Sequence, residues 1–190
     1  MTQDAFLYDA LRTPRGAGKP SGSLHEVKPI DLVVGLTHAL RDRHEGLDPA
    51  DIEDMILGCV SPVGDQGAVL PRVAALKAGL PQTVAGVQLN RFCASGLEAV
   101  AAAAARITRD GAPVAVAGGV ESISLVQPVT RRDLVQNPWL MEHKPDIYIS
   151  MIETADNVAR RYQISREEQD RFSLESQRRT AAAQDAGRFD

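Results

Sequence analysis

The stretch from Val87 to Leu97 reads VQLNRFCASGL and joins an apolar run of strand type to a helical pattern. The run Val84–Leu89 predicts a buried strand, and Cys93–Arg109 predicts a helix. Cys93 therefore falls at a sharp strand-to-helix junction. In an open α/β sheet, ligand-binding clefts lie at the carboxyl ends of the strands. The stretch thus indicates a fold class and a position at which a side chain is lifted toward a cleft.

The alternation of short apolar runs and helical patterns continues on both sides of this stretch. Pro29 opens one helical pattern, and Gly67–Gly79 predicts another helix. Further strands are predicted at Ala5–Asp9, Met55–Val60 and Pro113–Ala117. Because strand-helix alternation with continuous apolar strands is typical of an α/β domain, we expect this class over residues 1–120.

Residues 121–190 differ in character, and we expect them to form a second domain. Ser122–Pro145 carries several prolines and no clear period, as in an ordered excursion or a binding loop. Two helices are predicted after it. The second begins at the capping box Ser165-x-x-Glu168 and ends at Gly187.

The composition excludes several classes of protein. The chain has 190 residues, of which 44% are apolar and 24% charged, and its formal net charge is −4. This acidic balance argues against a nucleic-acid partner. We find no secretory signal and no run that reaches the ~18 apolar residues of a membrane span, so no membrane partner is expected. Two cysteines without a signal predict free thiols and a cytoplasmic location.

Two interpretations of Cys93 remain open at this point. The amino end of a helix stabilises a thiolate through its dipole and free N–H groups, and the thiolate is the nucleophilic form. The same N–H groups can hold an oxyanion, and the small residues 94–96 let a substrate approach the backbone. The alternative is a buried packing thiol at a strand end. Cys59 lies inside an apolar strand run and is predicted to be such a core residue.

Residues 90–97, NRFCASGL, resemble the active-site signature of the thiolases, the acetyl-CoA acetyltransferase and 3-ketoacyl-CoA thiolase family. Further similar motifs occur in the family's order at residues 12–16, 74–81, 117–124 and 164–189. The resemblance implies the first half of an α/β fold with two similar halves in a layered α-β-α-β-α stack. Residues 1–120 then form most of an amino-terminal half-domain, and residues 121–190 form an inserted loop domain that covers the acyl-CoA.

The resemblance also implies a reaction. Cys93 corresponds to the nucleophile, which attacks an acyl-CoA thioester or the 3-keto carbon of a ketoacyl-CoA to give an acyl-enzyme. A second thioester or free CoA then takes the acyl group. CoA thioesters are the expected substrates, and neither a cofactor nor a metal is expected. A redox or protease-like thiol is disfavoured because no Cys-x-x-Cys pair occurs.

Residues 151–156, MIETAD, resemble the family's pocket motif with two departures. Met151 corresponds to a substrate-binding residue, with a core methionine on a helix face as the alternative. Ile152 stands in place of a glycine and Asp156 in place of a glutamate, which leaves the acyl-chain preference open. Three basic residues are candidates for the CoA phosphates, with a solvated basic face as the alternative: Arg131, Arg132 and Lys144.

The family's remaining catalytic groups are an asparagine, a histidine in a Gly-His-Pro setting and a second cysteine in a Cys-x-Gly-Gly setting. None of the four histidines has that context: His25, His38, His44 and His143. We therefore expect a half whose carboxy-terminal half is a separate or lost chain, and which alone is inactive and poorly stable. Val84–Leu89 is expected near the contact of a homodimer or tetramer. The alternative function is a non-catalytic acyl-CoA-binding or assembly subunit.

Overall fold

The computed structural model describes residues 4–189, without the side chain of Arg132. The chain divides into two compact units, Met1–Thr130 and Arg131–Asp190, and each is described by itself. The boundary between them falls ten residues after the predicted one at residue 120.

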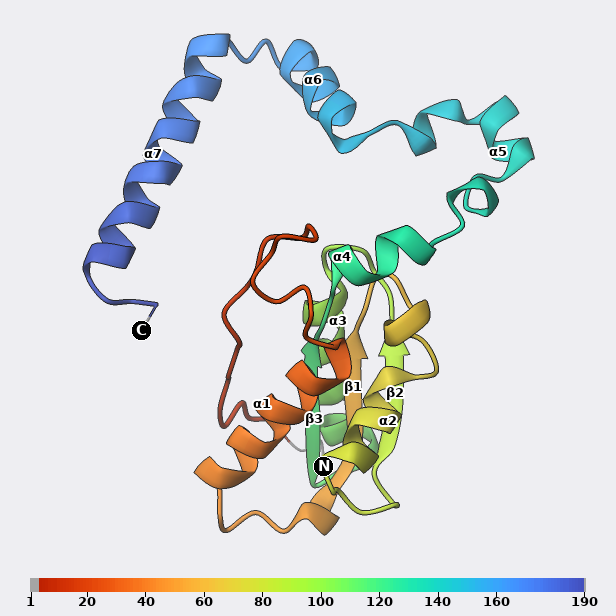
Figure 1. The fold of residues 1–190 in the computed structure, drawn as a ribbon, viewed down its shortest axis with the longest axis vertical. Helices are drawn as coiled ribbons and strands as arrows, with labels where there is room; N and C mark the ends of the chain where they lie inside the picture. The colour runs from red at the N-terminus through yellow and green to blue at the C-terminus, as the bar shows by residue number, and fades with distance from the viewer. Residues whose placement is uncertain (1–3, 190) are drawn as a thin grey trace. The chain divides into compact units, whose positions relative to one another are not determined.

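A three-stranded parallel sheet forms the centre of the first unit (Figure 1). Its strands are β1 (Ile52–Gly58), β2 (Ala85–Leu89) and β3 (Val114–Gly119), in the order β2-β1-β3. Both pairings are parallel, so the carboxyl ends of all three strands lie at one edge. These strands match three of the four predicted, and the α/β class is confirmed.

Helices cover both faces of the sheet (Figure 1). The helices α1 (Pro29–Arg43) and α2 (Leu70–Lys77) pack on the face that carries Met55 and Leu57 of β1. The helix α3 (Ser95–Ala105) packs through Ala99 and Ala103 on the opposite face, against Ile56. A short π-helical turn, Arg106–Asp110, extends α3, and the short helix α4 (Ile123–Val126) follows β3. Successive residues of a strand point to opposite faces of the sheet, and β1 therefore contributes side chains to both hydrophobic clusters.

The predicted strand Ala5–Asp9 is wrong. These residues form no ladder, and Phe6, Leu7 and Tyr8 are exposed. A strand exists only where its backbone pairs with a neighbour, and the apolar run alone does not supply one. Instead, the segment is held to the end of α1 by Asp9, whose carboxylate accepts hydrogen bonds from Arg43 and His44 at 3.0–3.2 Å.

Two predicted helices begin later than their apolar patterns. The pattern at Gly67 gives a helix only from Leu70, because Ala68 and Val69 have φ of 55° and 54°, in the left-handed region. The pattern at Cys93 gives α3 only from Ser95, which leaves Cys93 in the connection before the helix. Helix boundaries of this kind depend on backbone angles that periodicity does not report.

The described part of the second unit contains three α-helices: α5 (Pro138–His143), α6 (Met151–Arg161) and α7 (Arg166–Asp185). The last two were predicted. The capping box of Ser165 and Glu168 is confirmed, and a second capping box, Ser150 with Glu153, begins α6. In the part of the chain that the structure describes, no helix is both long enough and apolar enough to cross a membrane.

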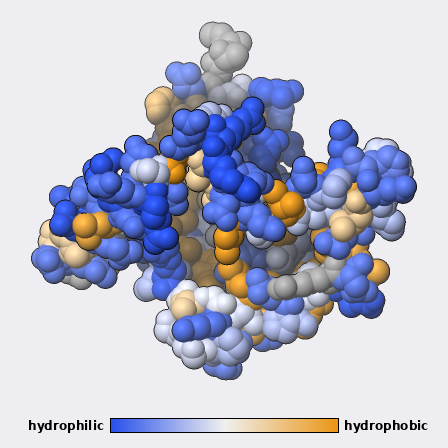
Figure 2. Space-filling view, turned by 90° about the horizontal axis from the view of Figure 1, so that it is seen from above, coloured by the Kyte–Doolittle hydropathy of each residue, from blue (hydrophilic) through white to orange (hydrophobic). Residues whose placement is uncertain are grey.

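Many large apolar side chains are exposed in each unit, and hydrophobic patches are visible among the hydrophilic surface in Figure 2. Examples are Phe6, Phe92 and Leu97 in the first unit, and Met151 and Phe172 in the second. Soluble monomers rarely expose large apolar patches. Such surfaces are typical of segments that other protein covers.

Candidate active site

Cys93 lies on the short connection between β2 and α3, at the carboxyl edge of the sheet. Its side chain is exposed, so the structure places it where a reagent can reach it. The amino end of α3 follows two residues later and carries no side-chain cap. Uncapped N–H groups at a helix start favour a negative charge nearby. The geometry therefore suits an exposed thiol beside a site that can hold a negative charge.

The connection, residues 90–95, is called the Cys93 elbow below. Phe92 has a φ of 48°, a left-handed conformation that costs a bulky residue about 1–2 kcal/mol. Two side chains hold it there. The Phe92 N–H donates to Asn90 Oδ1 at 2.8 Å, and Ser95 Oγ donates to the Phe92 carbonyl at 2.6 Å. Ser95 Oγ also accepts from the Arg91 N–H at 2.8 Å, which closes the elbow around Cys93.

Two glycines let the first turn of α3 lie directly on the sheet edge. A Cβ at Gly58, the last residue of β1, would lie 2.4 Å from the Ser95 carbonyl carbon and 2.7 Å from the Gly96 nitrogen. A Cβ at Gly119, the last residue of β3, would lie 3.5 Å from the Gly96 Cα. The absence of a side chain at Gly58 is therefore a condition for the position of the elbow.

A polar cluster lies at the same edge, and we call it the Gln66 cluster. Gln66 is fully buried, and its Nε2 donates to Ser61 O at 2.9 Å and to Glu121 Oε1 at 2.8 Å. Its Oε1 accepts from the Ser122 N–H, and its backbone oxygen accepts from Gln88 Nε2 at 2.6 Å. A buried amide with every polar atom engaged rigidifies its surroundings. The sequence did not predict the role of Gln66 in this cluster. The only signal was the presence of polar residues in the loops that follow two apolar strands.

Cys59 is buried in this cluster with 2% exposure, and its sulfur accepts a hydrogen bond from Gln66 at 3.3 Å. Burial, followed by the negative charge of Glu121, raises the pKa of the Cys59 thiol. The prediction that Cys59 is a core residue is confirmed. The two cysteines therefore differ sharply in access.

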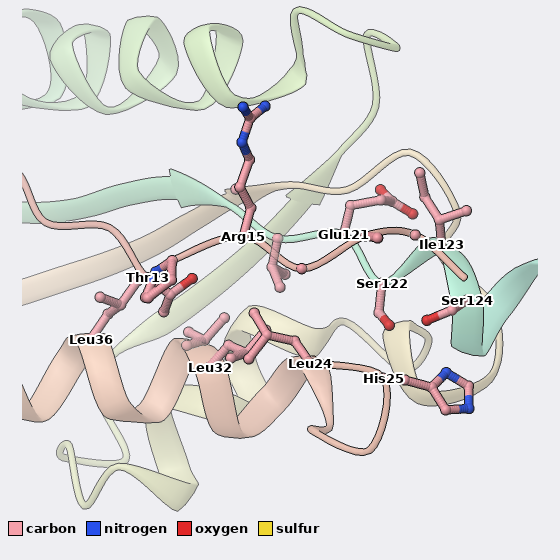
Figure 3. A pocket seen from close by; sticks show the side chains of 17 residues that line it. Thr13, Arg15, Leu24, His25, Leu32, Leu36, Glu121, Ser122, Ile123 and Ser124 are labelled. Carbon is pink, nitrogen blue, oxygen red and sulfur yellow. The ribbon is translucent and has the colours of Figure 1, made fainter. Parts of the chain in front are cut away.

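A pocket of about 240 Å³ lies beside the Gln66 cluster (Figure 3). It is lined by the loop 13–18, by α1 leucines and by residues 119–124, among them Glu121 and Ser122. In Figure 3 the side chain of Arg15 extends to the side opposite the leucines of α1. Cys93 is not among the lining residues.

His38, His44 and His143 contact groups of their own unit, whereas His25 lines the pocket with a buried Nδ1 that has no hydrogen-bond partner among the described residues. His38 Nε2 lies 3.3 Å from Ala78 O, and His44 Nε2 lies 3.0 Å from Asp9. His143 stacks on Trp139 at 4.4 Å in the second unit. No hydrogen bond or ion pair joins a histidine to residues 90–95 within the described part of the chain. In the first unit, none of the described histidines is therefore hydrogen-bonded to Cys93.

The other sequence-predicted site residues belong to the second unit. Met151 is the first residue of α6 and is 80% exposed. Arg131 is paired with Asp133, with its Nε 2.8 Å from the carboxylate, and Lys144 follows the end of α5. The side chain of Arg132 lies outside the described part of the structure.

Fold and site together define an α/β protein with an exposed cysteine on a strained strand-to-helix elbow, the setting of a cysteine nucleophile. The family model described as thiolase, N-terminal domain, matches residues 5–190, and the chain belongs to the thiolase family. The resemblance given by the motifs is thereby confirmed.

Individual relatives agree with the family. The chain is 38% identical to the beta-ketoadipyl-CoA thiolase of Pseudomonas aeruginosa, over 100% of this chain and 50% of that protein. It is 39% identical to the 3-ketoacyl-CoA thiolase of Bacillus subtilis, over 98% of this chain and 47% of that one. The crystal structure of the Bacillus anthracis acetyl-CoA acetyltransferase matches 89% of this chain and 45% of that chain, with a TM-score of 0.71 and 34% identity. The chain thus spans about half the length of the curated relatives it matches.

Proposed function

We propose that Cys93 is the nucleophile of an acyl-CoA acyltransferase of the thiolase type. Its thiolate adds to the carbonyl carbon of an acyl-CoA, a new sulfur-carbon bond forms, and the bond to the CoA sulfur breaks. CoA leaves and takes up a proton, and an acyl-enzyme on Cys93 remains. The observation that carries the proposal is the exposed cysteine on the strained elbow at the uncapped start of α3. Membership of the thiolase family supports it.

The second half-reaction transfers the acyl group onward. In condensation the acceptor is the α-carbon of a second acyl-CoA, and in thiolysis of a 3-ketoacyl-CoA it is the sulfur of free CoA. Condensation needs a base that removes a proton from the α-carbon. Because no hydrogen bond joins a histidine of the first unit to Cys93 in the described residues, we propose that this base comes from the part of the thiolase that these 190 residues do not cover. On this proposal the 190 residues alone catalyse at most the acylation step.

The substrate proposed is a CoA thioester of a short or 3-oxo acyl group. The names of the relatives, which are thiolases of 3-ketoacyl-CoA and beta-ketoadipyl-CoA, support this class. We propose Met151 as a residue of the acyl pocket, where Ile152 narrows the space. Lys144 is the better candidate for a CoA phosphate, since the guanidinium of Arg131 is already paired with Asp133.

Acyl-enzyme trapping tests the proposal directly. The 190-residue chain is incubated with acetyl-CoA, digested at low pH and analysed by mass spectrometry, with Cys93→Ser and Cys59→Ser as matched variants. We expect one acetyl group on the peptide that contains Cys93, lost in Cys93→Ser and retained in Cys59→Ser. Retention of acetyl-CoA by the unaltered chain without acylation would instead support the non-catalytic acyl-CoA-binding subunit.

A further inference from the structure

Val60, the second residue after β1, is held at both ends of its backbone. Its N–H donates to Glu121 Oε2 at 2.7 Å, and its carbonyl accepts from Asn90 Nδ2 at 3.0 Å. Glu121 follows β3 and Asn90 follows β2. The loop after β1 therefore bridges the loops that follow the two outer strands.

Asn90 links Val60 to the Cys93 elbow through hydrogen bonds. Its amide uses both ends, since Nδ2 donates to Val60 O while Oδ1 accepts from the Phe92 N–H at 2.8 Å. A rotation of the amide would break both hydrogen bonds at once. Phe92 stays in its left-handed conformation only as long as its surroundings hold it there, and Cys93 is the next residue.

Glu121 also has a hydrogen-bond partner on its second carboxylate oxygen, the one that does not accept from Val60. Its Oε1 accepts from Nε2 of Gln66, which is fully buried and also anchored on Ser61 and Ser122. Each of the two oxygens of the Glu121 carboxylate thus accepts a hydrogen bond from one N–H. A side-chain amide has only one oxygen and cannot accept at both positions. An amide at this position would turn an NH₂ group toward one of the two donors.

We propose that Glu121 is a positioning residue for Cys93, acting through Val60 and Asn90 to hold the strained elbow in the geometry for acyl transfer. The inference rests on the proposed function in one respect, that Cys93 is the acylated residue. The relay of hydrogen bonds from Gln66 to Phe92 crosses all three strand ends. Displacements of about 1 Å at a reacting group cost on the order of a hundredfold in rate, so a loss of this support has a large kinetic effect.

The first test is the acylation of Cys93 by acetyl-CoA in single turnover, in the full chain with Glu121→Gln. We expect the limiting rate to fall at least about tenfold, while the half-saturating acetyl-CoA concentration stays within about twofold. Alkylation of Cys93 by iodoacetamide, which needs no aligned oxyanion donors, stays within about threefold. Glu53→Gln is the matched control, because Glu53 is exposed on β1 and its substitution removes the same charge. We expect it to leave all three quantities unchanged.

The second test does not depend on acylation. Hydrogen exchange of the Phe92 N–H, followed by NMR, is expected to accelerate at least about tenfold in Glu121→Gln and not in Glu53→Gln, although the hydrogen bonds of Glu121 go to Val60 and Gln66. Asn90→Asp, which keeps the acceptor and loses the donor to Val60, is expected to show the same acceleration. Unchanged exchange at Phe92 in Glu121→Gln would overturn the relay. If the unaltered chain is not acylated at all, the proposed function fails, while the exchange rates still decide the relay. Faster hydrogen exchange throughout β1 and α2 in Glu121→Gln would mean general loosening and would also overturn the proposal.

Discussion

Substitution of Gly58 by alanine tests whether the first turn of α3 lies directly on the end of β1. The added Cβ would lie 2.4 Å from the carbonyl carbon and 2.5 Å from the oxygen of Ser95. Since carbon atoms in contact are about 3.5 Å apart, strand and helix must separate by roughly 1 Å. The neighbours are backbone atoms, which cannot turn aside as a flexible side chain does. Overpacking of this kind costs about 1–3 kcal/mol of the free energy of unfolding.

Gly35→Ala is the matched control. Gly35 lies inside α1, and a Cβ there meets nothing within 4 Å. The same substitution at an open helical position stabilises by roughly 0.5–1 kcal/mol. The two variants are therefore expected to move the free energy of unfolding in opposite directions, with a difference of about 1.5–4 kcal/mol.

Urea unfolding followed by far-UV circular dichroism measures this difference, and hydrogen exchange mass spectrometry locates it. We expect faster exchange at the start of α3 in Gly58→Ala. Because Cys93 lies two residues before that helix, acylation by acetyl-CoA is expected to fall by about tenfold or more as well. If Gly58→Ala and Gly35→Ala unfold at the same urea concentration, the close approach of Gly58 to Ser95 is refuted.

Three further predictions follow from individual side chains. Near pH 7, iodoacetamide should alkylate Cys93 at least about a hundredfold faster than Cys59, because Cys59 is buried and burial raises the pKa of its thiol. Equal labelling of the two tryptic peptides that contain these cysteines would contradict this prediction. The hydrogen bond from His44 lowers the pKa of Asp9, so the stabilisation by the ionised carboxylate is present at neutral pH and lost as the pH falls through that lowered value. Asp9→Asn should therefore lower the thermal midpoint at neutral pH and have no effect in strong acid. Ser165→Ala removes the cap of α7 and should cost about 1 kcal/mol of helix stability, seen as faster hydrogen exchange in its first turn and not in α6.

The elements that the sequence predicted correctly are those with a local cause. Apolar runs of five or six residues predicted β1, β2 and β3, and the proline at Pro29 marked the start of α1. The capping box at Ser165 needs only four residues of sequence to be recognised. The segment Ala5–Asp9 has the same apolar pattern as a strand, yet pairing depends on a distant backbone that no local pattern reports.

In the candidate site, too, the sequence predicted the local features and not those that depend on distant residues. The position of Cys93 between a strand and a helix is local, and the sequence predicted it. The left-handed conformation of Phe92 and the close approach of Gly58 to α3 are angles and distances that periodicity does not contain. The contact of Gln66 with Glu121 joins residues 55 positions apart in the chain, and a single polar residue in a loop gives no sign of such a partner.

The parallel arrangement of the strands explains how residues from three loops can join in the hydrogen bonds that support the Cys93 elbow. In a parallel sheet the loops that leave neighbouring strands emerge at one edge, whereas in an antiparallel sheet they alternate between two edges. Here Asn90 leaves β2, Val60 leaves β1 and Glu121 leaves β3, so three residues far apart in sequence meet within hydrogen-bond distance. The exposed thiol, which follows the outer strand β2, can then be reactive while the hydrogen bonds that position it come from the buried side of the same edge. The strained Phe92 is held by Asn90 and Ser95 of the elbow itself, and Val60 and Glu121 from two other loops support it through Asn90.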